Sequence, residues 1–267
     1  MIGGVVGDYI GSEYEHKTLR TYNLLKLTSV KSHITDESVM LAATADALIH
    51  DVDFARCYLK WGRHFSNVEF GPGTSFWLEQ GDVDYCHESY GNGAAARAGI
   101  IGMLDLGLFE ILDLAAKSAR CTHNSEEGIN GAKAMAYTVF AMRSGYKKET
   151  VYNYLLKEYG YLMYYDYEQL KTDLTYSSSA EITVPVSIFL ALESKNWNDC
   201  IRKCLYCAGG GDTDSIMSMA SLIKSQSHPI DKKYLNQTKR WLFQHAQPIL
   251  QMAREFEVKR ALCKLPF

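Results

Sequence analysis

Three regularly spaced glycines near the start of the chain constrain its fold more than any other feature. Gly3, Gly7 and Gly11 recur every four residues within the apolar segment 2–11. In an α-helix, this spacing places all three glycines on one face. Each glycine inside a helix costs about 1 kcal/mol relative to alanine, so the close approach of a neighbouring helix backbone is the expected reason for the pattern. The chain is therefore predicted to begin with a helix packed tightly against another helix.

The rest of the chain has helical rather than strand patterning. Only five prolines occur among 267 residues, and few alternating runs of β-branched residues are bounded by turn residues. No repeat, linker or low-complexity segment divides the chain. We therefore predict an all-α fold, a compact helical bundle that forms a single domain over residues 1–267. Beyond the first helix, we expect helices over residues 39–49, 94–106, 111–120, 128–143, 149–158, 184–192, 198–208, 214–224 and 232–262, the last being kinked or interrupted at Pro248.

Composition and charge exclude several classes of protein. Hydrophobic residues at 47% and charged residues at 22% are typical of an ordinary globular protein. A net charge of -3 gives no basic footprint for nucleic acid, and no apolar stretch approaches the roughly 20 residues that span a bilayer. The first ten residues contain Asp8 and no basic region, unlike a secretory signal. We expect a soluble, cytoplasmic monomer with no stable nucleic-acid or membrane partner, although an uncleaved secretion signal would escape this test.

The cysteines give no disulfide framework. There are seven of them, an odd number, without a repeated spacing. Cys200, Cys204 and Cys207 share a helical face, which leaves a zinc site as an alternative. Structural zinc sites usually have four nitrogen or sulfur ligands, and no histidine lies nearby in the sequence. We interpret these three cysteines as reduced packing residues.

Two acidic clusters carry the chemistry of the chain. One is Thr-Asp-Glu-Ser at residues 35–38, and the other is Gly-Gly-Gly-Asp-Thr-Asp-Ser at residues 209–215. Each lies where a loop enters an apolar helix. Hard cations such as Mg²⁺ prefer oxygen ligands, so the two clusters, if folded together, would form an all-oxygen pocket for two ions. Asp36 and Asp214 could instead serve only as helix N-caps, but the clusters supply more side-chain oxygens than two caps need.

Two further segments are candidates for binding. Residues 89–97 form a glycine-flanked turn that enters a helix, where exposed amides favour an anion such as phosphate. A plain Asn-Gly turn is the alternative reading of this segment. His123 precedes another glycine-bounded helix, and a lone histidine there is usually a hydrogen-bonded structural residue. Taken alone, Glu13 and Glu15 are typical of solvated charges.

Together these segments resemble the ADP-ribosylglycohydrolase family, which includes the dinitrogenase reductase-activating glycohydrolase. The resemblance begins with the glycine-acid-glycine helix at the start of the chain and continues in the family's order over nearly the whole sequence. The matching segments are residues 3–15, 35–40, 71–73, 90–97, 122–128, 184–185 and 210–215. The resemblance implies a compact, orthogonal all-α bundle whose cleft holds two Mg²⁺ or Mn²⁺ ions.

The resemblance also implies a reaction and its residues. Relatives cleave the bond between the anomeric carbon of the distal ribose of ADP-ribose and an acceptor, often a modified protein side chain. The implied metal ligands are Thr35, Asp36, Glu37, Asp212, Asp214 and Ser215. The implied catalytic residues are Asp36, Glu37, Asp214 and Glu15, the last guarding the site. The implied substrate-binding residues are Gly71, Gly73, Ser89, Tyr90, Gly91, Asn92, Gly93 and His123.

Two residues depart from the family pattern. Glu37 stands where the family usually has aspartate, and its extra methylene changes the reach of the carboxylate. Ser215 stands where the family has threonine, which keeps the hydroxyl but loses the stiffness of a β-branched side chain. We expect a Mg²⁺-dependent hydrolase that removes ADP-ribose from an acceptor such as arginine. The alternatives are a non-hydrolytic ADP-ribose-binding or structural relative, and a hydrolase of an ADP-ribose ester or another O-linked ADP-ribose.

Overall fold

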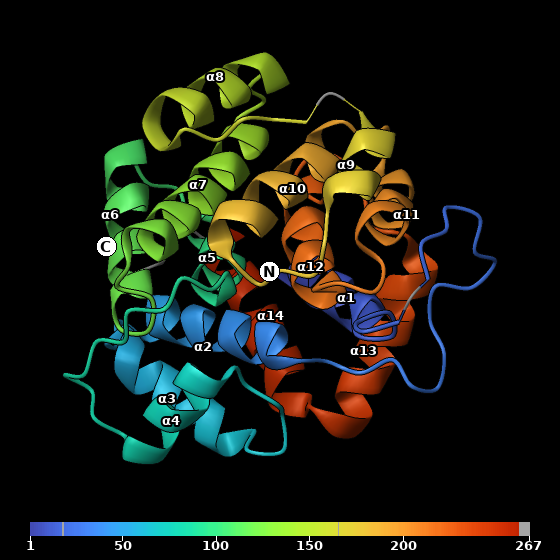
Figure 1. Cartoon of the computed structure of the whole chain (residues 1–267). Coiled ribbons are helices and arrows are strands. Elements are labelled where there is room, and N and C mark those ends of the chain that lie inside the picture. The colour runs from blue at the N-terminus through green and yellow to red at the C-terminus, as the bar shows by residue number, and fades with distance from the viewer. Residues whose placement is uncertain (18, 165, 262–267) are drawn as a thin grey trace.

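The protein folds as a bundle of helices. A computed structural model describes residues 1–17, 19–164 and 166–261. These residues form fourteen α-helices and one 3₁₀-helix, with isolated β-bridges but no strand (Figure 1). The all-α prediction is confirmed. Within the described residues, no helix is both long enough and apolar enough to cross a membrane.

The centre of the bundle is α12 (Thr213–Lys224), every residue of which is buried. Helices from both halves of the chain pack against it, five of them most extensively. These five are α1 (Ile2–Gly11), α5 (Gly93–Ala98), α7 (Glu126–Arg143), α10 (Ala180–Leu192) and α11 (Trp197–Ala208). The core therefore surrounds the helix that begins with the second acidic cluster.

The glycine face of α1 lies against α12, as the sequence predicts. A Cβ atom added at Gly7 would overlap the Met217 carbonyl oxygen and lie 2.6 Å from its carbon. A Cβ at Gly11 would lie 2.5 Å from the Asp214 Cα atom. Real Cβ atoms essentially never approach this closely, so only glycine permits the two backbones to meet. We call this contact the glycine seam.

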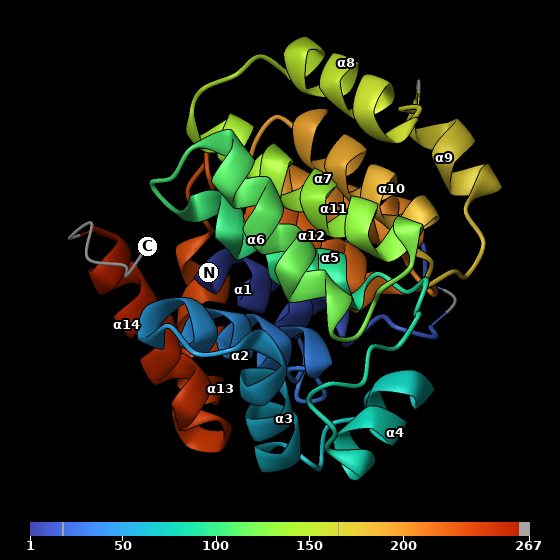
Figure 2. The same ribbon diagram turned by 90° about the vertical axis from the view of Figure 1, so that its left-hand side faces the viewer.

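The other helices surround this centre. α2 (Asp36–His50) packs on α1, on α3 (Phe54–His64) and on α14 (Gln247–Ala261). Figures 1 and 2 show α8 and α9 on the outside of the bundle, on the side opposite to α3 and α4. The remaining helices are α4 (Pro72–Gln80), η1 (Gly99–Met103), α6 (Leu108–Arg120), α8 (Lys148–Tyr159), α9 (Tyr167–Asp173) and α13 (Lys232–His245).

Several helix boundaries differ from the sequence-based expectation. α3, α4 and α9 were not expected, and η1 takes the place of an α-helical second half in the segment 94–106. α10 begins at Ala180, four residues before the expected start, which puts Pro185 inside the helix. The last segment breaks at Ala246, two residues before Pro248. The six described cysteines are all free, and the three on α11 are buried.

Candidate active site

A large cavity opens where α2 and α12 begin. Its volume is about 1080 Å³, and it is lined by both acidic clusters, the glycine turn at residues 89–93 and parts of the segments 64–74 and 241–246. Every site residue predicted from the sequence lines this cavity except Tyr90, whose side chain is 58% exposed. Six carboxylate residues face it, whereas no lysine or arginine among the described residues does.

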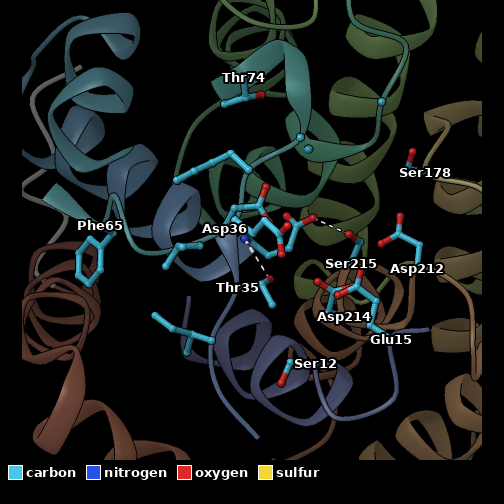
Figure 3. Close-up of a pocket in the computed structure, with 18 of the residues that line it drawn as sticks. Ser12, Glu15, Thr35, Asp36, Phe65, Thr74, Ser178, Asp212, Asp214 and Ser215 are labelled. Atoms are coloured by element: carbon cyan, nitrogen blue, oxygen red, sulfur yellow. Dashed lines mark hydrogen bonds between the residues drawn. The ribbon is translucent and has the colours of Figure 1, made fainter. Parts of the chain in front are cut away.

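The two acidic clusters meet inside this cavity. The Ser215 hydroxyl donates a hydrogen bond of 2.5 Å to the Glu37 carboxylate, across 178 positions of sequence. Figure 3 shows Asp36, Asp214 and Ser215 close together at the centre of the cavity. The clusters therefore converge, as the metal-site prediction requires.

Neither Asp36 nor Asp214 caps its helix. Thr35 is the N-cap of α2, and its side chain accepts a hydrogen bond from the Glu37 amide. Asp212 occupies the N-cap position of α12 without a side-chain cap bond. The alternative in which the two aspartates serve only as N-caps is therefore wrong, because neither carboxylate is used in a helix cap.

Asp8 is a site residue that the sequence reasoning missed. It is fully buried on α1, and its carboxylate accepts hydrogen bonds from the Thr35 amide at 3.0 Å and from the Thr35 hydroxyl at 2.7 Å. It also accepts from the amide and the hydroxyl of Ser38. Asp8 thereby fixes the first turn of α2, which carries the first acidic cluster. A lone acid within an apolar, glycine-rich helix was the available signal.

Burial and mutual repulsion oppose ionisation of these carboxyls. Burial, followed by the neighbouring Asp214, raises the pKa of Asp8 to about 7 and that of Glu15 to about 7. Burial raises the pKa of Asp36 and of Glu37 well above the usual range, and the nearby acids raise both further. These carboxyls therefore favour their protonated forms at neutral pH unless a cation enters, because no lysine or arginine among the described residues lines the cavity to balance their charge.

The chemistry of this donor set fits hard dications. All the groups that meet at the centre are carboxylate or hydroxyl oxygens, the ligands that Mg²⁺ prefers. One buried oxygen, Asp214 Oδ1, has no hydrogen-bond partner in the described structure, and an unpaired buried carboxylate oxygen is costly unless a cation or a donor meets it. No three acidic, imidazole or thiol side chains among the described residues form a ready-made metal cage. Oε1 of Glu37 accepts the hydrogen bond from Ser215, and a carboxylate has further lone pairs with which it can ligate an ion.

The glycine turn is joined to the second acidic cluster. The Asn92 side chain donates to the Asp212 carboxylate at 2.6 Å and to the Thr183 hydroxyl at 2.9 Å. The Asn92 amide donates to the Ser178 carbonyl at 2.9 Å. Through these bonds, the turn at residues 89–93 is held at a fixed position beside the carboxylates.

His123 lies behind the glycine turn. A Cβ added at Gly91 or Gly93 would lie 3.4 to 3.5 Å from its ring, so the ring is close to the turn. Its Nδ1 shares a hydrogen bond of 2.8 Å with the Thr122 hydroxyl. Burial, followed by the charge of Arg97, lowers the pKa of His123 well below the usual range, so this ring is neutral at physiological pH. His123 is thus both a hydrogen-bonded residue and part of the cavity wall.

The fold and this acidic cavity define an all-α protein with an oxygen-lined site, and comparison with known proteins identifies the family. A family model described as ADP-ribosylglycohydrolase matches residues 1–228. The chain belongs to the ADP-ribosylglycohydrolase family, which confirms the resemblance seen in the sequence. The matched region ends before α13.

Individual relatives are distant but cover most of the chain. The chain is 23% identical to the ADP-ribosylhydrolase ARH3 of Mus musculus, over 84% of this chain and 81% of that protein. It is 22% identical to the ADP-ribosylhydrolase ARH3 of Homo sapiens, over 87% of this chain and 85% of that protein. A solved structure of an ADP-ribosylglycohydrolase-related protein complex shares the fold, with a TM-score of 0.66 and 16% identity over 94% of this chain and 95% of that one.

Proposed function

We propose that the protein is a Mg²⁺-dependent hydrolase that releases ADP-ribose from a modified acceptor, foremost an ADP-ribosylated arginine side chain. The observation that carries this proposal is the convergence of the two acidic clusters around the unpaired Asp214 Oδ1 atom. Membership of the ADP-ribosylglycohydrolase family supports a hydrolase. Mn²⁺ is a second candidate ion, since it also prefers oxygen ligands.

The proposed reaction uses the carboxylates as ligands and as orienting groups. Thr35, Asp36, Glu37, Asp212, Asp214 and Ser215 would hold two ions. When bound, such ions supply positive charge that positions hydroxyl groups and makes a nearby water more acidic. Hydrolysis of a glycosidic bond passes through an oxocarbenium-like transition state, which a carboxylate can steady while it orients water. We assign this orienting role to Asp36 and Glu37, and we assign Glu15, at the cavity wall, to control of entry.

The glycine-lined part of the cavity would hold the rest of the substrate. Ser89, Gly91, Asn92 and Gly93 present a turn whose glycines leave room for a group to approach the backbone. Gly71 and Gly73 line the same cavity, and so does the neutral ring of His123. We assign the turn to the pyrophosphate and His123 to the neighbouring ribose or phosphate.

A panel of substrates tests this proposal. ADP-ribose linked to arginine, to serine and through an ester would each be incubated with the protein and Mg²⁺, with and without a chelator. Mass spectrometry would follow the release of ADP-ribose. We expect release from the arginine-linked substrate that is lost with the chelator. Stabilisation of the protein by ADP-ribose without any release would instead identify a non-hydrolytic binding protein, because a ligand that binds the native state raises apparent stability.

Ion binding is also expected to stabilise the protein more at neutral than at acidic pH. With pKa values of about 7, Asp8 and Glu15 hold protons in the folded, metal-free protein that they would lose on unfolding. The free energy of unfolding of that form therefore falls as pH rises from about 4 to about 7. Protons compete with metal ions for carboxylates. Melting temperatures with Mg²⁺ and with a chelator should thus differ more near pH 7.5 than near pH 5.5. Equal differences at both pH values would contradict a carboxylate site for the ion.

A further inference from the structure

The cavity extends past the carboxylates, away from the glycine turn. Figure 3 shows Phe65 and Ser178 on opposite sides of Asp36 and Asp214. The side that carries Ser178 includes the glycine turn, because the Ser178 carbonyl accepts from the Asn92 amide. The opposite side has no role in the function proposed above. A substrate whose pyrophosphate lies on the turn and whose anomeric carbon lies at the carboxylates must direct its acceptor toward this opposite side.

We propose that Trp241 and Glu69, which both line this cavity, bind the acceptor and select a cationic, planar side chain. This inference rests on the proposed function and deepens it by naming the residues that recognise the acceptor. Trp241 lies on α13 and is half-buried, whereas Glu69 is exposed. We call Trp241, Glu69 and Phe65, which all line the cavity, the acceptor wall.

Trp241 is held by a rigid helix rather than by a loop. Tyr234, Thr238 and Leu242 recur every four residues and are buried, so this face of α13 is anchored to the core. Trp241 packs its ring against Tyr9 of α1, with 5.9 Å between ring centroids. Because α1 also carries Asp8 and the glycine seam, the indole has a fixed position relative to the carboxylates.

The charge of the acceptor wall favours a cation. Glu15 and Glu69 line the cavity and are not among the proposed metal ligands. They lie close enough for Glu69 to raise the pKa of Glu15, after the larger effects of burial and of Asp214. No lysine or arginine among the described residues faces the cavity to balance them. A guanidinium group can pair with such a carboxylate and also lie on an indole face.

Of the acceptor wall, Trp241 lies in the part of the chain that the family model does not cover. The matched region ends at residue 228, whereas α13 begins at Lys232. Trp241 therefore belongs to a segment in which this chain can differ from its relatives while the carboxylates stay the same. Such a position supports a contribution of Trp241 to acceptor choice rather than to bond cleavage.

Substitution of Trp241 tests the inference. We expect Trp241→Ala to raise KM for an ADP-ribosyl-arginine peptide about tenfold with little change in kcat, because the lost contact is present before and during the reaction. Affinity for free ADP-ribose, which lacks an acceptor, should stay within about twofold of wild type. Phe243→Ala is the matched control, since Phe243 lies on the same helix, is 63% exposed and does not line the cavity. Trp241→Phe keeps an aromatic face and should recover most of the loss.

Glu69→Gln provides an independent test at an exposed position where folding is not at risk. It should weaken binding of the arginine-linked peptide but not of a serine-linked one, as measured by titration calorimetry with and without turnover. Loss of ADP-ribose affinity equal to the loss for the peptide would overturn the inference, and so would unchanged binding of the peptide in both variants. A wild-type protein that binds no ADP-ribose would overturn the proposed function and the inference together. Normal ADP-ribose binding without these effects would overturn the inference alone.

Discussion

Asp214→Asn is expected to reduce release of ADP-ribose by about 1000-fold or more, the scale of losing a preorganised charged group in an active site. The substitution keeps the size of the side chain but removes the negative charge of an oxygen that has no partner in the described structure. Asp36→Asn should have a similar effect because Asp36 of the first cluster lies beside Asp214 in the same cavity (Figure 3). Initial rates of ADP-ribose release at saturating Mg²⁺ would measure both losses.

The same two substitutions are expected to stabilise the metal-free protein. Asp214 lies among carboxyls whose pKa values it raises, so removal of its charge relieves repulsion. Loss of activity together with a higher melting temperature would separate a role in the site from a role in folding. Asp53→Asn is the control, because Asp53 is an exposed N-cap of α3 and asparagine caps equally well. Unchanged turnover in Asp214→Asn would reject the assignment of this residue as a ligand.

Gly7→Ala is expected to destabilise the protein by about 2 kcal/mol. Overpacking of a dense core costs about 3 kcal/mol at the upper end, and the higher helix propensity of alanine offsets about 1 kcal/mol. The new methyl group would meet the Met217 carbonyl group, which is backbone and cannot turn away. For a chain of this size, the melting temperature should fall by about 4 to 8 °C.

A glycine in open space supplies the control for this measurement. A Cβ atom at Gly71 would meet nothing within 4 Å, so Gly71→Ala should lower the melting temperature less than Gly7→Ala does, through the loss of glycine at the N-cap of α4 alone. Thermal unfolding followed by circular dichroism in the presence of a chelator would compare the two variants without a contribution from metal. If Gly7→Ala melts like Gly71→Ala, the glycine seam is not as close as described.

Local sequence signals predicted the parts of the fold that depend on local chemistry. The bounds of α1 follow from its apolar run and its glycines, and those of α11 and α12 are predicted to within one residue at each end. α3 was missed although Asp53 caps it and its apolar residues all lie on one face, the pattern of an amphipathic helix. Pro185 was expected near the start of its helix, but buried packing lets α10 extend four residues before the expected start. Tertiary packing decides this second case, and a single sequence does not display it.

The candidate site shows the same division. The oxygen-rich motifs could be recognised from their composition, and the structure places all of their predicted ligands around one cavity. The role of Asp8 was not predicted, because its importance lies in four hydrogen bonds to residues that are about 30 positions away. Trp241 and Glu69 gave no signal, since an aromatic residue on an amphipathic helix is typical of ordinary packing. Residues that act through their spatial neighbours rather than through a motif can be recognised only in the folded structure.

The glycine seam has a consequence for how the protein can be regulated. α1 holds the first acidic cluster through Asp8, and its last glycine lies against the Cα atom of Asp214 in the second. Loosening of this helix pair would therefore disturb both acidic clusters together. Local unfolding of one acidic cluster alone would therefore be an unsuitable way to regulate this protein. An effector that binds at the rim of the cavity would leave this helix pair in place.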